Sequence, residues 1–156
     1  MRKSLLLILA LACLLGAGPK SPAIVTIQPM KALEVQPGFH AEFQIDLQIL
    51  KGFHIQANPA SEPYLIATTL KLESVEGIKT SDPVYPKGIS FQLNGSEKAI
   101  STYEGTITIK VLLDVDAHAE SGERILKGSL RYQGCDARTC FPPVTIPFEE
   151  KIKVAD

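Results

Sequence analysis

The chain is poor in cysteine and has only one long apolar run, which lies at its start. Beyond that run, no stretch approaches the roughly 20 consecutive apolar residues that a membrane helix needs, so no transmembrane helix is predicted in the mature chain. No window of ten or more residues repeats apolar side chains with a helical period, and there is no internal repeat. Basic residues do not outnumber acidic ones, which argues against nucleic acid as a partner.

The N-terminus has the three parts of a secretory signal peptide. Arg2 and Lys3 precede an uncharged apolar run over residues 5–15, and small residues follow. We therefore predict that residues 1–23 are a signal peptide, cleaved near 18–23, and that the chain is periplasmic or otherwise exported. Cleavage removes three basic residues and no acid, so the formal net charge changes from −1 to −4. A loose lipidation-box pattern at Cys13 leaves a lipid anchor as a second interpretation.

The remainder, residues 24–156, is predicted to be one all-β domain. Alternation of apolar and polar residues predicts four long strands, at residues 39–49, 106–115, 125–133 and 144–148. Shorter strands are expected at residues 24–27, 53–56, 66–72 and 89–93. Pro147 within the last long strand indicates a sheet edge or a bulge. Strands of this number, separated by turns, predict an antiparallel β-sandwich of immunoglobulin-like type, with an open barrel as the alternative.

Two cysteines remain in this domain, Cys135 and Cys140, where one predicted strand ends and the next begins. In an oxidising compartment they are expected to form a disulfide. A loop this short removes roughly 2 kcal/mol of unfolded-chain entropy, against about 4 kcal/mol for a loop of sixty residues or more. The small gain favours an exchanging disulfide, and a structural one remains the alternative. Two thiolates are half of a tetrahedral metal site and no second pair follows, so neither metal nor cofactor is predicted.

Charges beside the cysteines predict which sulfur reacts. Arg138 lies inside the loop and favours a nearby thiolate, whereas Asp136 follows Cys135 directly and opposes ionisation there. Both charges point to Cys140 as the reactive thiol.

The same segment carries a family resemblance. Tyr132-Gln133-Gly134-Cys135, a short polar loop and Cys140-Phe141-Pro142-Pro143 together resemble the N-terminal periplasmic domain of the DsbD thiol:disulfide interchange proteins. Lys51-Gly52-Phe53-His54-Ile55 and Tyr103-Glu104-Gly105 support the resemblance, which extends from about residue 24 to 154.

The resemblance implies an immunoglobulin-like fold and a redox-active disulfide that shuttles electrons. By position, Cys140 is the more exposed thiol that forms mixed disulfides, and Cys135 is its resolving partner. Supporting roles fall to four further residues, Tyr132, Phe141, Pro142 and Phe53.

A cap loop over the disulfide is also implied. The matching stretch is residues 85–98, and its aromatic residues Tyr85 and Phe91 are the candidate lids. The alternative for Phe91 is an ordinary core position in a strand.

The partners implied are a thioredoxin-like protein or domain and a membrane electron conductor as donors, and oxidised periplasmic thiol proteins as acceptors. Because no membrane-conducting segment or thioredoxin-like domain follows the motif, we expect the donor to be a separate protein. Activity as a thiol:disulfide oxidoreductase is one hypothesis. The other is a non-catalytic immunoglobulin-like protein-binding domain with a structural hairpin disulfide, whose reduction potential would lie below about −300 mV.

Overall fold

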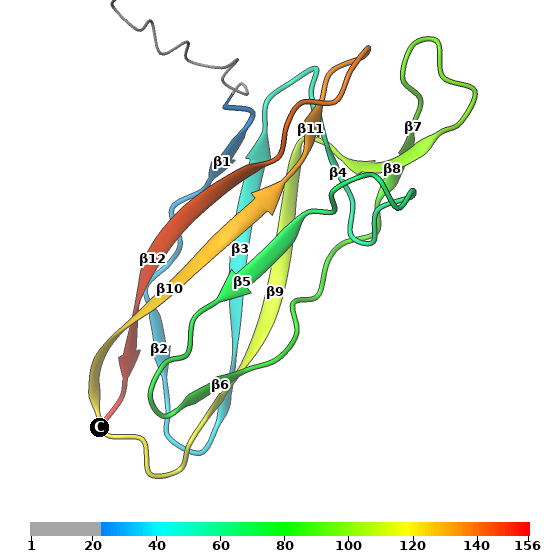
Figure 1. The fold of residues 1–156 in the computed structure, drawn as a ribbon. Helices are drawn as coiled ribbons and strands as arrows, with labels where there is room; N and C mark the ends of the chain where they lie inside the picture. Colours follow the sequence, from blue (N-terminus) through cyan, green and yellow to red (C-terminus); the bar gives the residue numbers. More distant parts are fainter. Residues whose placement is uncertain (1–22) are drawn as a thin grey trace, which may run out of the picture.

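The computed structural model describes residues 23–156, in which twelve strands form three sheets (Figure 1). The first sheet has the spatial order β1 (Val25–Ile27), β3 (His40–Ile49), β9 (Thr106–Val115), β6 (Ile78–Thr80). The second has the order β2 (Leu33–Val35), β12 (Val144–Val154), β10 (Gly122–Tyr132), β5 (Thr69–Leu72). The third has the order β11 (Gly134–Cys135), β4 (His54–Gln56), β8 (Ile100–Tyr103), β7 (Ile89–Phe91). Neighbouring strands are antiparallel except for the parallel pair β2 and β12.

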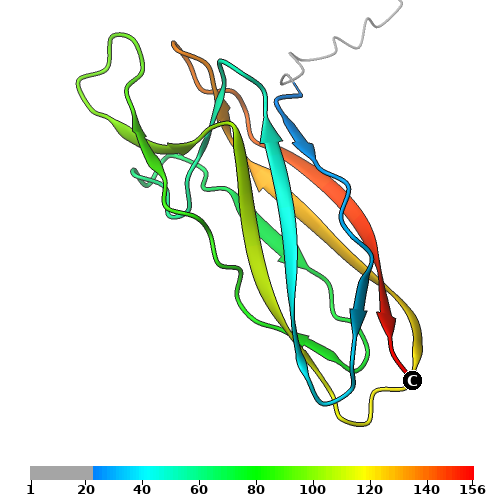
Figure 2. The ribbon, with the colours of Figure 1, turned by 180° about the vertical axis from the view of Figure 1, so that it is seen from behind.

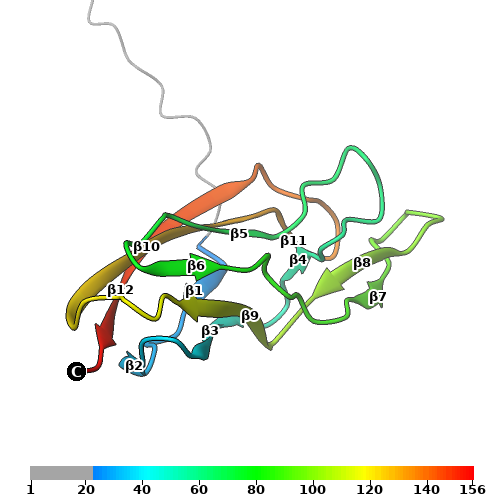
Figure 3. The ribbon, with the colours of Figure 1, turned by 90° about the horizontal axis from the view of Figure 1, so that it is seen from below.

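The first two sheets are the layers of an immunoglobulin-like sandwich, as the sequence predicted (Figure 3). Inward-facing residues of β3 and β9 alternate with exposed ones along both strands, and β10 supplies the opposite wall. The centre of the core is fully buried and aliphatic, with Ile45, Leu47, Ile109, Leu113, Leu126 and Leu130 at 0% exposure. Period-two alternation thus specified both the strands and the face that each one buries.

At one position the apolar–polar alternation of the sequence does not match the face that the strand buries. Phe39 was expected to face inward with the rest of the strand at 39–49, but it precedes β3 and is 63% exposed. Its amide donates to the carbonyl of Gln36 and its carbonyl accepts from Val115, so it belongs to the turn that enters the strand.

The edge position predicted for Pro147 is confirmed. Pro147 lies opposite Ser129 of β10, and β2 pairs with β12 only from Ile152 onward. The missing amide proton of Pro147 therefore interrupts no ladder on the β2 side.

The third sheet lies at the end of the sandwich away from the C-terminus, as the front and back views show (Figures 1 and 2). The buried hydroxyl of Tyr103 in β8 accepts a hydrogen bond from the amide of Asn58 at 3.0 Å and donates to the carbonyl of Pro86 at 3.0 Å. It thereby ties together the two loops that flank this sheet.

Among the described residues there is no helix, and hence none able to cross a membrane. Cys13 and all but the last residue of the predicted signal peptide lie outside the described residues.

Candidate functional site

The two cysteines are joined in a disulfide, with an S–S distance of 2.02 Å. Cys135 ends β11, pairs with His54 of β4 and is completely buried. Cys140 lies five residues further on and is partly exposed. The expected hairpin tip is therefore half incorporated into the third sheet, and only one of its two sulfurs is within reach of a partner.

Gly134 leaves room for the side chain of Ile24 beside β11. A Cβ atom at this position would collide with the side chain of Ile24, which packs directly over the backbone. A larger residue here would require the Ile24 side chain to move aside.

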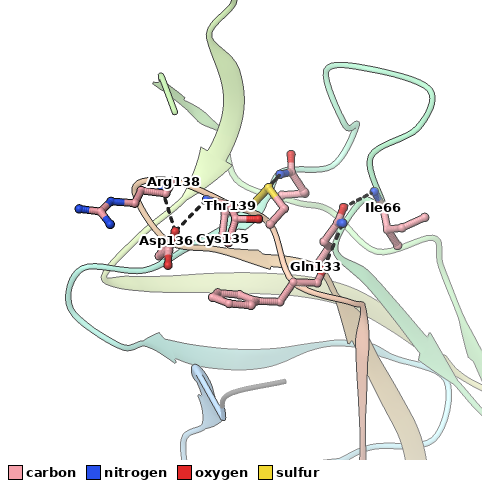
Figure 4. Close-up of a disulfide and its surroundings, with 9 residues drawn as sticks. Ile66, Gln133, Cys135, Asp136, Arg138 and Thr139 are labelled. Atoms are coloured by element: carbon pink, nitrogen blue, oxygen red, sulfur yellow. Dashed lines mark hydrogen bonds between the residues drawn. A yellow bond between two sulfur atoms is a disulfide. The ribbon is translucent and has the colours of Figure 1, made fainter. Parts of the chain in front are cut away.

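The loop between the cysteines is closed by Asp136. One carboxylate oxygen accepts hydrogen bonds from the amides of Arg138 at 2.7 Å and Thr139 at 2.8 Å (Figure 4). These two amides, in that order, hold the pKa of Asp136 below its ordinary value. The Arg138 side chain is exposed and extends away from the sulfurs in Figure 4. Exposure therefore distinguishes the two sulfurs more clearly than these charges do.

Gln56 contacts both sulfurs, a contact that the sequence reasoning missed. The residue is fully buried, and its Nε2 donates to Cys135 Sγ at 3.2 Å and to Cys140 Sγ at 3.6 Å. A glutamine in a short strand carries no motif, and only the pairing of β4 with β8 and β11 brings it beneath the disulfide.

His54 lies on the same face of β4 as Gln56, since residues two apart in a strand face the same side. Its Nε2 is 3.0 Å from Glu104 Oε2, and its side chain is only 12% exposed. Phe91 of β7 stacks on the imidazole with ring centroids 3.7 Å apart. Phe91 thus belongs to a strand, as the alternative interpretation held, and covers the polar residue directly opposite Cys135.

The predicted supporting aromatics fall into two environments. Phe53 and Phe141 form a tilted pair with centroids 6.2 Å apart, and the Phe141 amide donates to the carbonyl of Gly134 at 2.7 Å. Tyr132 is 1% exposed at the end of β10, and burial raises the pKa of its hydroxyl. Tyr132 is therefore a core residue that precedes the cysteine loop, whereas Phe53 and Phe141 brace the loop's exit.

Gln133 fixes the return of the chain after Cys140, where Pro142 is exposed. Its side-chain oxygen accepts from the amide of Ile66 at 2.9 Å, and its Nε2 donates to the Phe141 carbonyl at 3.3 Å (Figure 4). The amide thus connects the cysteine loop to the segment before β5.

The hairpin formed by β7 and β8, residues 89–103 and hereafter the cap hairpin, reaches the cysteine loop. The amide of Asn94 near its tip donates to the carbonyl of Ala137 at 2.8 Å. Beside this contact lies a groove of about 330 Å³, to which Cys140 contributes. Its other walls include Tyr64, Leu65, Leu93, Ile100 and Arg138.

Of the two candidate lid residues, neither lines this groove. Tyr85 packs against the core, and its hydroxyl accepts from the amide of Leu70 at 2.9 Å. Burial raises the pKa of Tyr85. Phe91 faces His54, while Leu93, two residues further on, shares the groove with Cys140. The sequence search overlooked Leu93 because it looked for an aromatic.

A fully buried and a partly exposed cysteine in one short loop, at the end of an immunoglobulin-like sandwich, define a domain that carries an asymmetric disulfide. The model of the family "Thiol:disulfide interchange protein DsbD, N-terminal" matches residues 24–151. The chain belongs to this family and is a thiol–disulfide interchange module.

Solved structures give weaker likenesses. A structure of the complex between the DsbD N-terminal and PilB N-terminal domains from Neisseria meningitidis is 19% identical. The match covers 68% of this chain and 71% of that chain, with a TM-score of 0.45. The N-terminal periplasmic domain of ScsB from Proteus mirabilis is 12% identical over 81% of this chain and 43% of that chain, with a TM-score of 0.48. Comparison with curated proteins gave no match.

Proposed function

We propose that this domain is a periplasmic electron relay that works by thiol–disulfide exchange. It accepts reducing equivalents from a thioredoxin-like protein or domain, or from a membrane electron conductor, and passes them to oxidised periplasmic thiol proteins. The observation that carries the proposal is the asymmetry of the disulfide, in which Cys140 opens onto a groove while Cys135 is fully buried. Family membership supports the exchange chemistry.

The asymmetry assigns an order to the chemistry. A thiolate of the donor attacks Cys140 Sγ, the S–S bond breaks, and Cys135 leaves as a thiolate with the bonding electron pair. The second thiol of the donor, as thiolate, then attacks the donor's own sulfur in the mixed disulfide and releases Cys140. The donor is left oxidised, and the domain holds two electrons as a dithiol once its thiolates have taken up protons. Delivery to an oxidised acceptor runs through the same steps in reverse, with Cys140 attacking.

The cap hairpin is proposed to shield the dithiol between acceptance and delivery. A reduced pair in an oxidising compartment is open to stray oxidants, and the groove gives them access to Cys140. Leu93 and the Asn94–Ala137 contact place the hairpin beside that sulfur. We assign the covering role to Leu93, with Phe91 holding the base of the hairpin against His54.

Trapping of mixed disulfides tests the order of attack. Cys135→Ser leaves Cys140 as the only thiol of the domain and should capture a thioredoxin-like partner whose resolving cysteine has been replaced. Cys140→Ser should capture little, because Cys135 is fully buried. The product is read by non-reducing electrophoresis and mass spectrometry, and equal capture by both variants contradicts the assigned order.

The rival function is a non-catalytic binding domain with a structural disulfide. The burial of Cys135 favours it, because a buried sulfur is protected from exchange. The accessibility of Cys140 weighs against it, because one exposed sulfur is sufficient for attack. The reduction potential described at the end of the Discussion separates the two.

A further inference from the structure

Gln56 is held rigidly beneath the disulfide by its own backbone. Its amide donates to the carbonyl of Gln133 at 3.0 Å, and its carbonyl accepts from both the amide and the hydroxyl of Thr68. The side chain therefore projects from a fixed point of β4, and its Nε2 lies 3.2 Å from Cys135 Sγ. Neither the side-chain amide of Gln56 nor the three hydrogen bonds that anchor its backbone involve a charged group.

Stability does not explain an amide at this position. Gln56 is fully buried, and its Oε1 has no hydrogen-bond partner within residues 23–156. Thr102, directly opposite on β8, is buried with its hydroxyl in the same condition among the described residues. A methionine would fill the space without leaving a buried oxygen unpaired, and unpaired buried polar groups destabilise a fold.

The amide is better matched to a charged sulfur than to the disulfide it now contacts. A disulfide sulfur is neutral and accepts hydrogen bonds weakly, whereas a thiolate accepts them as an anion. Cys135 is 0% exposed, so water cannot solvate a thiolate formed there. A hydrogen-bond donor already directed at the sulfur forms a stronger hydrogen bond as negative charge develops there, and it needs no reorganisation.

We propose that Gln56 is a further catalytic residue, whose Nε2–H stabilises the Cys135 thiolate that forms during exchange. The proposal rests on the proposed function. When a dithiol attacks Cys140, the electron pair of the S–S bond moves to Cys135, and Gln56 donates to that anion until it takes up a proton. In the reverse direction the same hydrogen bond keeps Cys135 ionised for its attack on the mixed disulfide at Cys140.

Two substitutions of similar shape separate this role from packing. Gln56→Met removes the donor, and Gln56→Glu keeps the shape but places a like charge beside the sulfur. In a Cys140→Ser background, the thiolate absorbance of Cys135 is followed against pH. The midpoint should move to higher pH in Gln56→Met and further in Gln56→Glu. At a fixed pH below the midpoint, we expect about tenfold less thiolate in Gln56→Met, because hydrogen bonds to charged groups are strong.

Exchange kinetics give a second readout in the protein with both cysteines. Reduction by dithiothreitol should slow about threefold in Gln56→Met, since exchange rates depend only partly on the leaving thiol's basicity. Gln133→Met is the matched control, because it removes a nearby, partly buried amide that contacts Ile66 and Phe141 and neither sulfur. It should leave the Cys135 midpoint unchanged, even if it lowers stability.

Failure of this inference is distinguishable from failure of the proposed function. Unchanged Cys135 ionisation in Gln56→Met, with normal exchange by the wild type, overturns the role of Gln56 alone. A shift of equal size in Gln133→Met also overturns it, since packing would then be the cause. If Gln56→Met does not fold, Gln56→Leu, which also lacks the donor, decides by the same midpoint. A folded wild type whose disulfide dithiothreitol cannot reduce ends the proposed function instead.

Discussion

The two sulfurs of the disulfide have different surroundings although four residues separate them. Cys135 is paired into a sheet, buried, and within hydrogen-bond distance of Gln56, while Cys140 shares a groove with Leu93. Exchange needs one sulfur that can be attacked and one that can leave, and these surroundings provide one of each. The chemistry of the site is thus set by burial and by a neutral amide.

Asp136 determines how the loop between the cysteines responds to pH. Its two amide donors lower its folded pKa below the unfolded value, so its contribution to stability is present above the unfolded pKa. That contribution is lost as the pH falls through the folded pKa, in the acidic range below the ordinary value of an aspartate. Denaturant unfolding of the oxidised wild type and of Asp136→Asn, compared across pH, should show a difference that is constant near neutrality and shrinks in acid. A difference independent of pH would contradict the role of the charge.

At the residue scale the sequence identified the cysteines but not their chemical neighbours. The two thiols are easily recognised because cysteine is rare in this sequence and both lie in one short connection between strands. Gln56 and Leu93 are ordinary residue types in short strands or turns, and they approach the sulfurs only through strand pairing and a hydrogen bond between loops. Their roles depend on contacts between segments far apart in the chain, which a linear pattern does not record.

The cap hairpin is proposed to protect the reduced cysteine pair. Its tip is attached by the hydrogen bond from Asn94 to Ala137 and by the ion pair between Lys98 and Glu62. Its base is held in the third sheet by the pairing of β8 with β4 and by the stacking of Phe91 on His54. Much of the tip is exposed, so few apolar contacts hold it closed. The tip can therefore open for a partner while the base stays in the third sheet.

Leu93→Ala should uncover Cys140. We expect the reduced pair to react severalfold faster with a small oxidant such as hydrogen peroxide, at a cost of about 1 kcal/mol in the free energy of unfolding. Thiol loss and denaturant unfolding are measured on the same purified variant. Ile89→Ala is the matched control, since Ile89 lies on β7 and is 43% exposed. Phe91→Ala should resemble Leu93→Ala; a loss of about 3–5 kcal/mol with unchanged thiol kinetics in its folded fraction would make Phe91 a core residue only.

Strand length influenced but did not alone decide which elements the sequence could predict, since the short strands β1, β4, β5 and β7 were also predicted. The ten-residue strands β3 and β9 show several full periods of alternation and were predicted within a residue of their ends. Strands β2, β6, β8 and β11 have two to four residues and were not predicted. Such segments become strands because a neighbouring strand offers hydrogen-bonding groups, so tertiary pairing decides their conformation. The last of these strands carries Cys135. The resemblance implied that Cys140 is the more exposed thiol, but the strand pairing that buries Cys135 was not predicted.

Stability and redox chemistry depend on different parts of the molecule. Its aliphatic core lies between β3, β9 and β10, whereas the disulfide lies on a small sheet at the end of the sandwich. Closing the short cysteine loop contributes roughly 2 kcal/mol, less than the 5–15 kcal/mol net stability typical of a domain. The fold should therefore tolerate both redox states, which an electron relay requires and a structural disulfide does not.

The reduction potential of the disulfide in the folded domain is the most direct test of whether the domain is an electron relay. The domain is equilibrated with dithiothreitol or glutathione buffers, the dithiol fraction is counted by alkylation, and circular dichroism confirms the fold at each potential. A relay should titrate between about −270 and −120 mV, where catalytic pairs lie, with the reduced domain still folded. A potential below about −300 mV, or unfolding on reduction, would identify a structural disulfide and contradict the electron-relay function.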